Sequence, residues 1–382
     1  MGSGSPYAPL FPDLPLRRVE EMGLKELERI RLILRGGSVI EWRRLHFTTR
    51  EEVDRFLRLC LLDPDDPEDQ RWMRTVLADA VAYLRKTFNY KVAEAVANPE
   101  EIHDLFLYAS GAKEPGKYRR IACIVLKVMH VIQHIEGREV LFKLEVSEAE
   151  IAEVLARRVA MCVQEMASKG IPVVEFALSF KSRDSLITKL LAKKETVAAQ
   201  VYDKTRFRIV TRTKQDILLA LYFLTQRLFP FNFVVPGQTV NSLISFKDLL
   251  SQYPNFAQHA NELHLHTDYE EDADDLQTRN RFSGPGYRVL NFVVDIPIRV
   301  DPWLPRLEED TRERKNRLAF GLVEFQIVDQ ETALQNEEGE SSHEKYKQRQ
   351  KYQVLRRLSR GLIVPMPAEK RKKRERSKKP GE

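Results

Sequence analysis

Cysteine is scarce in this chain of 382 residues, which also lacks long apolar runs. Cys60, Cys123 and Cys162 have no CxxC spacing, so nothing indicates a disulfide framework or a zinc site, and we expect three core residues in a reducing compartment. No stretch approaches the about 18 consecutive apolar residues of a membrane span, and the N-terminus has no charged region followed by an apolar run. These absences predict a soluble, cytoplasmic protein with no membrane partner.

Positive charge is in small excess, and most of the excess lies near the C-terminal end of the sequence. The net charge is +6, but the segment 368–382 alone holds eight Lys or Arg and three Glu. The body is therefore almost neutral, and its 43% hydrophobic residues are enough for two globular domains. Residues 362–382 are predicted to form a disordered basic tail, which is either simply solvated or touches the phosphates of a nucleic acid.

The N-terminal third has a helical pattern. After a disordered segment at residues 1–15, apolar residues recur at spacings of three and four, which predicts a helical domain over residues 16–145. A metal-dependent phosphohydrolase is one possible interpretation of two residue pairs in this region, His103 with Asp104 and His130 with His134. Neither pair has the additional ligand spacing of a metal site, so surface or core histidines are the favoured interpretation.

From residue 146 to residue 361 apolar strand-like runs alternate with helices, which predicts an α+β (mixed α/β) domain. A buried strand is expected at 172–180, then a helix at 182–193, a strand at 206–211, a helix at 216–228 and a strand at 231–235. Two more strands, at 287–300 and 320–328, precede one charged helix at 331–358. The polar stretch 243–281 contains His264 and His266 beside an acidic run, where a solvated insertion is favoured over a metal site.

Two blocks in this region carry cationic side chains. Lys181 ends a strand, and Ser185 and Lys189 share one face of the next helix, so two ammonium groups can line a cleft suited to a triphosphate. In the block VYDKTRFRIV, a carboxylate, Asp203, precedes Arg206 and Arg208, which project from one face of a strand. A carboxylate can hold Mg²⁺, and a guanidinium binds phosphate oxygens bidentately.

Two later blocks supply an aromatic ring and a second carboxylate. Tyr287 follows a Gly-Pro-Gly turn at the start of a strand, where its ring could stack on a base. Glu324 and Gln326 alternate with Val323 and Phe325 in the last strand, so they face solvent or a site. Composition alone favours solvent.

In this order the blocks resemble the synthetase domain of the RelA/SpoT family of alarmone synthetases. The family pattern R-x-K-S-x-x-S-I-x-x-K is matched from Lys181 to Lys189, and Y-D-L-x-x-x-R is matched at Tyr202, Asp203 and Arg208. Gly286 and Tyr287 match the next motif. The last motif is matched at the following residues: Glu324, Gln326, Ile327, Glu337, Gly339, His343, Tyr346 and Lys347.

The resemblance implies a nucleotidyltransferase fold with a central mixed sheet flanked by helices, working in the alarmone metabolism of the stringent response. It implies pyrophosphate transfer from ATP to the 3′-hydroxyl of a nucleotide, with Mg²⁺ held by Asp203 and Glu324. Lys181, Lys189 and Arg208 would hold the ATP phosphates, and Tyr287 would stack on the acceptor base. The remaining candidate substrate-binding residues are Ser185, Arg206, Asn291, Gln326 and His343.

The departures from the family pattern concern the same site. Ser179 stands where the family has its first Arg, Asn291 stands where it has His, and Val328 and Asp329 replace an Arg-Thr pair. These losses leave open a purine nucleotide or a tRNA 3′ end as acceptor. They also leave open a catalytically silent protein that binds a nucleotide or RNA, and a fold retained only as an interaction scaffold.

Overall fold

A five-stranded sheet with strand order β1-β2-β5-β4-β3 organises the protein. The computed structural model describes residues 18–36, 46–144, 146–192, 205–246, 248, 252–253, 256, 286–306, 316–338 and 343–358. The strands are β1 (Val173–Phe180), β2 (Thr205–Thr211), β3 (Val240–Asn241), β4 (Leu290–Arg299) and β5 (Leu318–Asp329). Only β2 and β5 pair in parallel, and the other pairs are antiparallel. The predicted α+β class with a mixed sheet is therefore confirmed.

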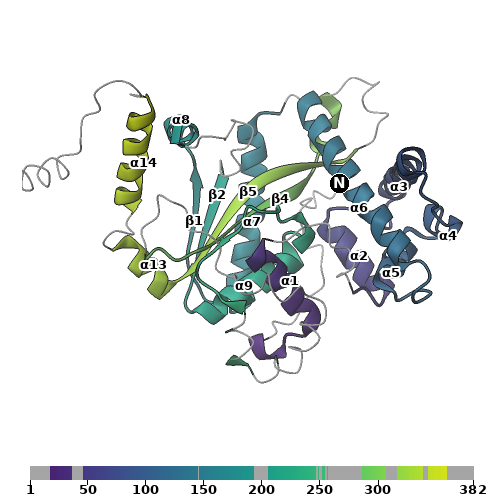
Figure 1. Cartoon of the computed structure of the whole chain (residues 1–382), viewed down its shortest axis with the longest axis horizontal. Coiled ribbons are helices and arrows are strands. Elements are labelled where there is room, and N and C mark those ends of the chain that lie inside the picture. Colours follow the sequence, from purple (N-terminus) through teal and green to yellow (C-terminus); the bar gives the residue numbers. More distant parts are fainter. Residues whose placement is uncertain are drawn as a thin grey trace, which may run out of the picture.

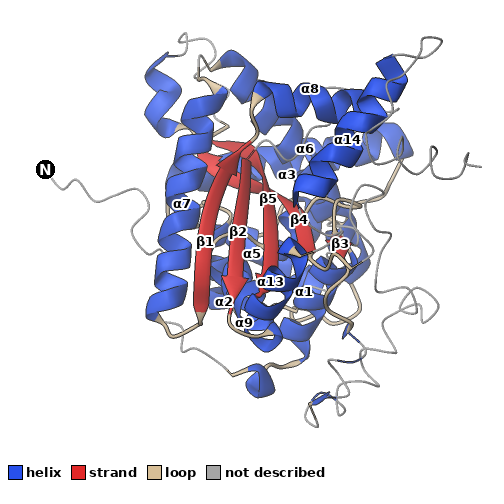
Figure 2. Ribbon diagram, turned by 90° about the vertical axis from the view of Figure 1, so that its left-hand side faces the viewer, coloured by secondary structure: helices blue, strands red, loops and turns tan. Residues whose placement is uncertain are grey.

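Helices flank this sheet on both faces (Figures 1 and 2). The α-helices are α1 (Leu24–Arg35), α2 (Arg50–Leu59), α3 (Pro67–Phe88), α4 (Glu94–Ala97), α5 (Ile102–Ser110), α6 (Arg119–Lys143), α7 (Glu148–Ser168), α8 (Arg183–Ala192), α9 (Lys214–Arg227), α13 (Gln330–Glu337) and α14 (His343–Leu358). Short 3-10 helices are η1 (Val19–Glu21), η4 (Phe231–Phe233) and η6 (Asp301–Arg306). Within the described part of the chain, no helix has both the length and the apolarity needed to cross a bilayer.

Local sequence signals set where these helices begin. At α7 the Ser147 hydroxyl accepts a hydrogen bond from the Glu150 amide at 3.2 Å, and the Glu150 carboxylate accepts one from the Ser147 amide at 2.8 Å. Thr213 and Asp216 form the same reciprocal pair at α9. These capping boxes satisfy amide groups that the first helical turn leaves unpaired.

One face of the sheet is apolar. Phe207, Phe325 and Phe292 lie on neighbouring strands with successive ring centroids 5.7 and 5.4 Å apart, and Phe229 packs against the last two. Helices α6, α7 and α9 contact the strands from this side. Burying each ring contributes on the order of 2 kcal/mol, so these stacks anchor the strands and direct the alternate side chains to the opposite face.

The N-terminal helices share this core. Helix α1 packs on α9, and α6 packs on β5, with α3 and α5 on the outer side of α6 (Figure 1). One hydrophobic cluster extends from Leu27 in α1 to Phe325 in β5. The division into domains at residues 145 and 146 stays a prediction, and the segments 1–15 and 362–382 lie outside the described residues.

Gly137 permits the close approach of α6 to the sheet. A Cβ atom at this position would lie 2.7 Å from Cδ2 of Phe320 and 3.2 Å from the carbonyl oxygen of Leu318. We expect Gly137→Ala to lower the free energy of unfolding by about 1–2 kcal/mol, because overpacking outweighs the better helix propensity of alanine. Urea unfolding would measure the loss. Adding Phe320→Leu should relieve the clash, so strictly additive losses in the double variant would contradict this account.

Three details differ from the sequence-based expectations. The expected strand at 231–235 is the 3-10 helix η4 followed by a single bridge from Val234 to Val294. A short apolar run shows that a segment is buried, but it does not distinguish a strand from a helical turn. The charged helix expected at 331–358 is two helices, since Glu338 is extended. Strand β1 was expected to be buried, but it is a sheet edge on which Val174 and Phe180 are exposed.

Candidate functional site

The second face of the sheet carries polar side chains at its centre. In the parallel pair β2 and β5, Arg206 is the register partner of Glu324, and Arg208 is the partner of Gln326. Asn291 on β4 pairs with Gln326 from the other side. Register partners point to the same face of a sheet, so these five predicted residues lie together, opposite the phenylalanine stacks.

Glu324 is at the centre of this polar face and is only 5% exposed. Its Oε2 accepts a hydrogen bond from Nε of Arg206 at 2.7 Å, and its Oε1 accepts one from Nδ2 of Asn291 at 2.5 Å. Burial by itself would raise the pKa of Glu324, but the Arg206 charge and the two hydrogen bonds together lower it. The preference for a solvent-facing Glu324, drawn from composition, was therefore wrong, and the buried side chain is a carboxylate.

Two lysines lie near each other at one end of the polar face, and Lys181 of this pair interacts with the Glu324 charge. Lys181 directly follows β1, and Lys189 is on α8, whose start is capped by the Ser182 hydroxyl accepting from the Ser185 amide at 3.3 Å. Burial and the neighbouring Lys189 charge lower the pKa of Lys181 to about 7, although Glu324 opposes the shift. Helix α14 packs along α8 at the same end of the sheet (Figure 2). The predicted pair of lysines is thus brought together, and Lys181 links it to Glu324.

Tyr287 lies at the opposite border of the polar face, just before β4. Nε2 of Gln326 donates a hydrogen bond to its hydroxyl at 2.8 Å, and burial raises the pKa of Tyr287. The segment is held by a residue that the sequence analysis missed, Asn336 of α13. Its Oδ1 accepts from the Arg288 amide at 3.0 Å, and its Nδ2 donates to the Arg288 carbonyl at 2.7 Å. No local signal marks Asn336, because its partner is 48 residues away.

Arg208 is half-buried between two exposed carboxylates. Its Nε lies 3.8 Å from Oε1 of Glu175, and its Nη1 lies 3.7 Å from Oε1 of Glu337. Both distances are long for ion pairs in water, so these contacts hold the guanidinium weakly. His343 is the first residue of α14, and its side chain is outside the described set.

Several predicted residues fall outside the part of the chain that the structure describes. Asp203, Tyr202 and Gly339 lie outside the described residues, as do His264 and His266. Within the described ranges, no group of three His, Cys, Asp or Glu side chains is arranged to hold a metal ion. The Glu324 carboxylate is nevertheless a suitable ligand for a hard cation such as Mg²⁺. Each of its oxygens accepts one described hydrogen bond and has a further lone pair that could coordinate the ion.

The histidines of the helical segment lie in or beside its core. Nε2 of His103 contacts the Asp54 carboxylate, and Asp104 pairs with Lys113 at 2.7 Å. The rings of His130 and His134 lie 4.4 Å apart, and His134 stacks on Phe320. Burial lowers the pKa of His130 to about 3, so this ring is neutral. The three cysteines are likewise buried, and no disulfide joins them in the part of the chain that the structure describes.

Comparison with known proteins gives only distant similarity. No known family model matches the chain, and no curated protein matches its sequence. Among solved structures, the chain is similar to small alarmone synthetase 2 from Bacillus subtilis at 14% identity and a TM-score of 0.29, over 59% of this chain and 83% of that one. It is also similar to small alarmone synthetase 1 from Bacillus subtilis bound to its product pppGpp, at 14% identity and a TM-score of 0.30, over 60% and 92%.

Proposed function

We propose that the polar face transfers pyrophosphate, or a nucleotidyl group, from ATP to the 3′-hydroxyl of a purine nucleotide or a tRNA. The observation that carries this proposal is Glu324, a buried carboxylate bonded to Arg206 and Asn291 and flanked by Lys181. A buried carboxylate among cations at the centre of a sheet is a costly arrangement, which is typical of functional sites. The resemblance of the sequence blocks to alarmone synthetases supplies the reaction class.

Four cations are proposed to bind the ATP phosphates: Lys181, Lys189, Arg206 and Arg208. Arg206 is also a possible replacement for the arginine that the family has where this chain has Ser179. Ser179 and Arg206 are register partners in the pair β1 and β2, so the two side chains face the same side of the sheet. We therefore propose that Arg206 supplies from β2 the guanidinium that the family supplies from the strand before it.

Tyr287 is proposed to stack on the base of the acceptor. Its hydroxyl is held by Gln326, and its backbone segment is held by Asn336, so the ring is fixed before a ligand arrives. A fixed ring loses little conformational entropy on binding, which favours stacking. Ser185 and His343 remain proposed substrate contacts at the α8 and α14 end.

Mg²⁺ is proposed to bind Glu324 together with Asp203. Bound there, the ion would neutralise phosphate charge in an in-line displacement. In pyrophosphate transfer the acceptor 3′-oxygen loses its proton to solvent and bonds to the β-phosphorus of ATP, the bond between that phosphorus and the α,β-bridging oxygen breaks, and AMP leaves. In nucleotidyl transfer the same oxygen bonds to the α-phosphorus and pyrophosphate leaves. The chain itself contributes position and charge: Asn291 fixes the Glu324 carboxylate, and the lysines and arginines hold the phosphates.

The proposal is tested by incubating the full chain and MgCl₂ with γ-labelled ATP and, separately, GDP, GTP, ADP and deacylated tRNA; α-labelled ATP would reveal nucleotidyl transfer. Label appearing on one acceptor, and lost on adding EDTA, would establish a transferase and identify its acceptor. Bound ATP without transfer to any of the four would overturn the enzymatic proposal.

A second candidate is a catalytically silent protein that binds a nucleotide or RNA. It is favoured by the Arg206–Glu324 ion pair, which already neutralises the carboxylate that a metal would need. It predicts ATP binding that is unchanged by EDTA, whereas the transferase requires the ion. Equilibrium dialysis of labelled ATP with and without MgCl₂ separates the two.

The pKa of Lys181 predicts a pH dependence of ATP binding. Because this pKa is lowered to about 7 in the free protein, phosphate binding restores the ammonium form and takes up a proton. Affinity for ATP should therefore fall as pH rises above 7, by up to about tenfold per unit. Lys181→Arg stays charged and should flatten the profile between pH 7 and 8.5. An equal slope in this variant and in the wild type would assign the dependence to another group.

A further inference from the structure

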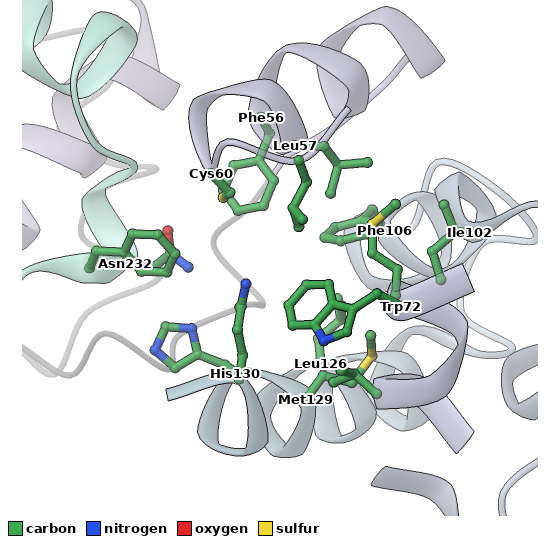
Figure 3. A pocket seen from close by; sticks show the side chains of 15 residues that line it. Phe56, Leu57, Cys60, Trp72, Ile102, Phe106, Leu126, Met129, His130 and Asn232 are labelled. Atoms are coloured by element: carbon green, nitrogen blue, oxygen red, sulfur yellow. The ribbon is translucent and has the colours of Figure 1, made fainter. Parts of the chain in front are cut away.

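A cavity of about 50 Å³ lies in the helical segment, away from the polar face (Figure 3). Helices α2, α3, α5 and α6 and the 3-10 helix η4 form its wall. Most of the lining is aliphatic, aromatic or sulfur-bearing, and includes Phe56, Leu57, Met73, Phe106, Leu126 and Met129. No Asp, Glu, Lys or Arg is among its described lining residues, so a charged molecule would lose its hydration there without compensation.

Two polar groups in this wall have unused hydrogen-bonding capacity. Asn232 is 2% exposed, and no described group hydrogen-bonds its amide nitrogen or its amide oxygen. Nε1 of Trp72 is also buried without a partner among the described residues. Figure 3 shows Asn232 and His130 on one side of the cavity, and Trp72 across from Asn232. Buried groups of this kind are normally paired, and each one left unpaired costs about 1–3 kcal/mol.

From these observations we infer that the cavity binds a small uncharged molecule with an apolar body and one hydroxyl group. The hydroxyl would donate to Oδ1 of Asn232 and accept from its Nδ2 or from the indole N–H of Trp72, and the body would occupy the apolar wall. The size of the cavity limits the ligand to a few water-sized groups. Nothing in this inference depends on the proposed transfer reaction.

Ethanol and propane provide the probes, because each has three non-hydrogen atoms, as the size of the cavity requires, and they differ only in a hydroxyl or a methyl group at one end. Each is titrated into the ¹⁵N-labelled full chain while the indole N–H signals are followed, with the Trp72 signal assigned from Trp72→Phe. Ethanol should shift this signal saturably and bind about tenfold more tightly than propane, which corresponds to one well-formed hydrogen bond. Asn232→Leu should remove most of that preference while leaving propane binding in place.

The exposed Asn98, replaced by leucine, is the matched control and should leave both titrations unchanged. The comparison of the two probes in the wild type needs no variant, so it stands even where Asn232→Leu fails to fold. No saturable shift with either probe would overturn the inference and assign the cavity to water. Equal affinities for ethanol and propane would overturn the role of the hydroxyl.

Discussion

Glu324→Gln is expected to reduce transfer by roughly 100-fold or more, with ATP still bound. The change keeps the shape of the side chain and its hydrogen bond with Asn291, but removes the negative charge at the centre of the polar face. A neutral amide is a weak ligand for Mg²⁺, so the proposed metal site would lose one of its two carboxylates. Initial rates of label transfer and equilibrium dialysis of ATP measure the two effects separately.

The control for this variant is Glu331→Gln, which changes an exposed carboxylate in the first turn of α13 and should leave transfer unchanged. Because Glu324→Gln also leaves the Arg206 guanidinium without its buried partner, some stability should be lost. The double variant with Arg206→Gln should recover stability without recovering transfer. Transfer at the wild-type rate in a folded Glu324→Gln protein would remove Glu324 from the site.

Arg299→Met is expected to lower the free energy of unfolding by about 3 kcal/mol. Nη1 of Arg299 donates to both carboxylate oxygens of Asp69 at 2.8 and 2.9 Å, and its Nε donates to Asp301 at 2.6 Å. Asp69 is 1% exposed, and its other described cationic contact, Nη1 of Arg317, lies 3.9 Å from its Oδ1, so removing the Arg299 guanidinium leaves a buried charge poorly compensated. The contact joins α3 to the end of β4, and the variant should therefore loosen the helical segment from the sheet.

Urea unfolding followed by circular dichroism measures this loss. Arg71→Met, an exposed change on α3, should cost little and is the matched control. Asp69→Asn in the Arg299→Met background removes the poorly compensated charge and should recover part of the stability. A loss below about 1 kcal/mol in Arg299→Met, or no recovery in the double variant, would mean that solvent already screens the pair.

The local parts of the fold were predictable from the sequence. Periodicity and end signals placed α7, α8 and α9 to within a few residues, because helix caps and amphipathic patterns depend on neighbours within one or two turns. Strands β2, β4 and β5 followed from alternating or apolar runs. The segment 231–235 was misassigned as a strand, since an apolar run buried by tertiary contacts has no period of its own.

The sequence by itself determined the order of the four motifs that carry the candidate site residues. It also determined, by alternation along the strand, that Glu324 and Gln326 face one side of the sheet and Phe325 faces the other. Only the tertiary structure decided that Glu324 is buried, that Asn291 and Arg206 orient its two oxygens, and that Asn336 holds the Tyr287 segment. These contacts join residues 33, 118 and 48 positions apart. Their geometry depends on strand register, which long-range packing of the phenylalanine face fixes and no local pattern encodes.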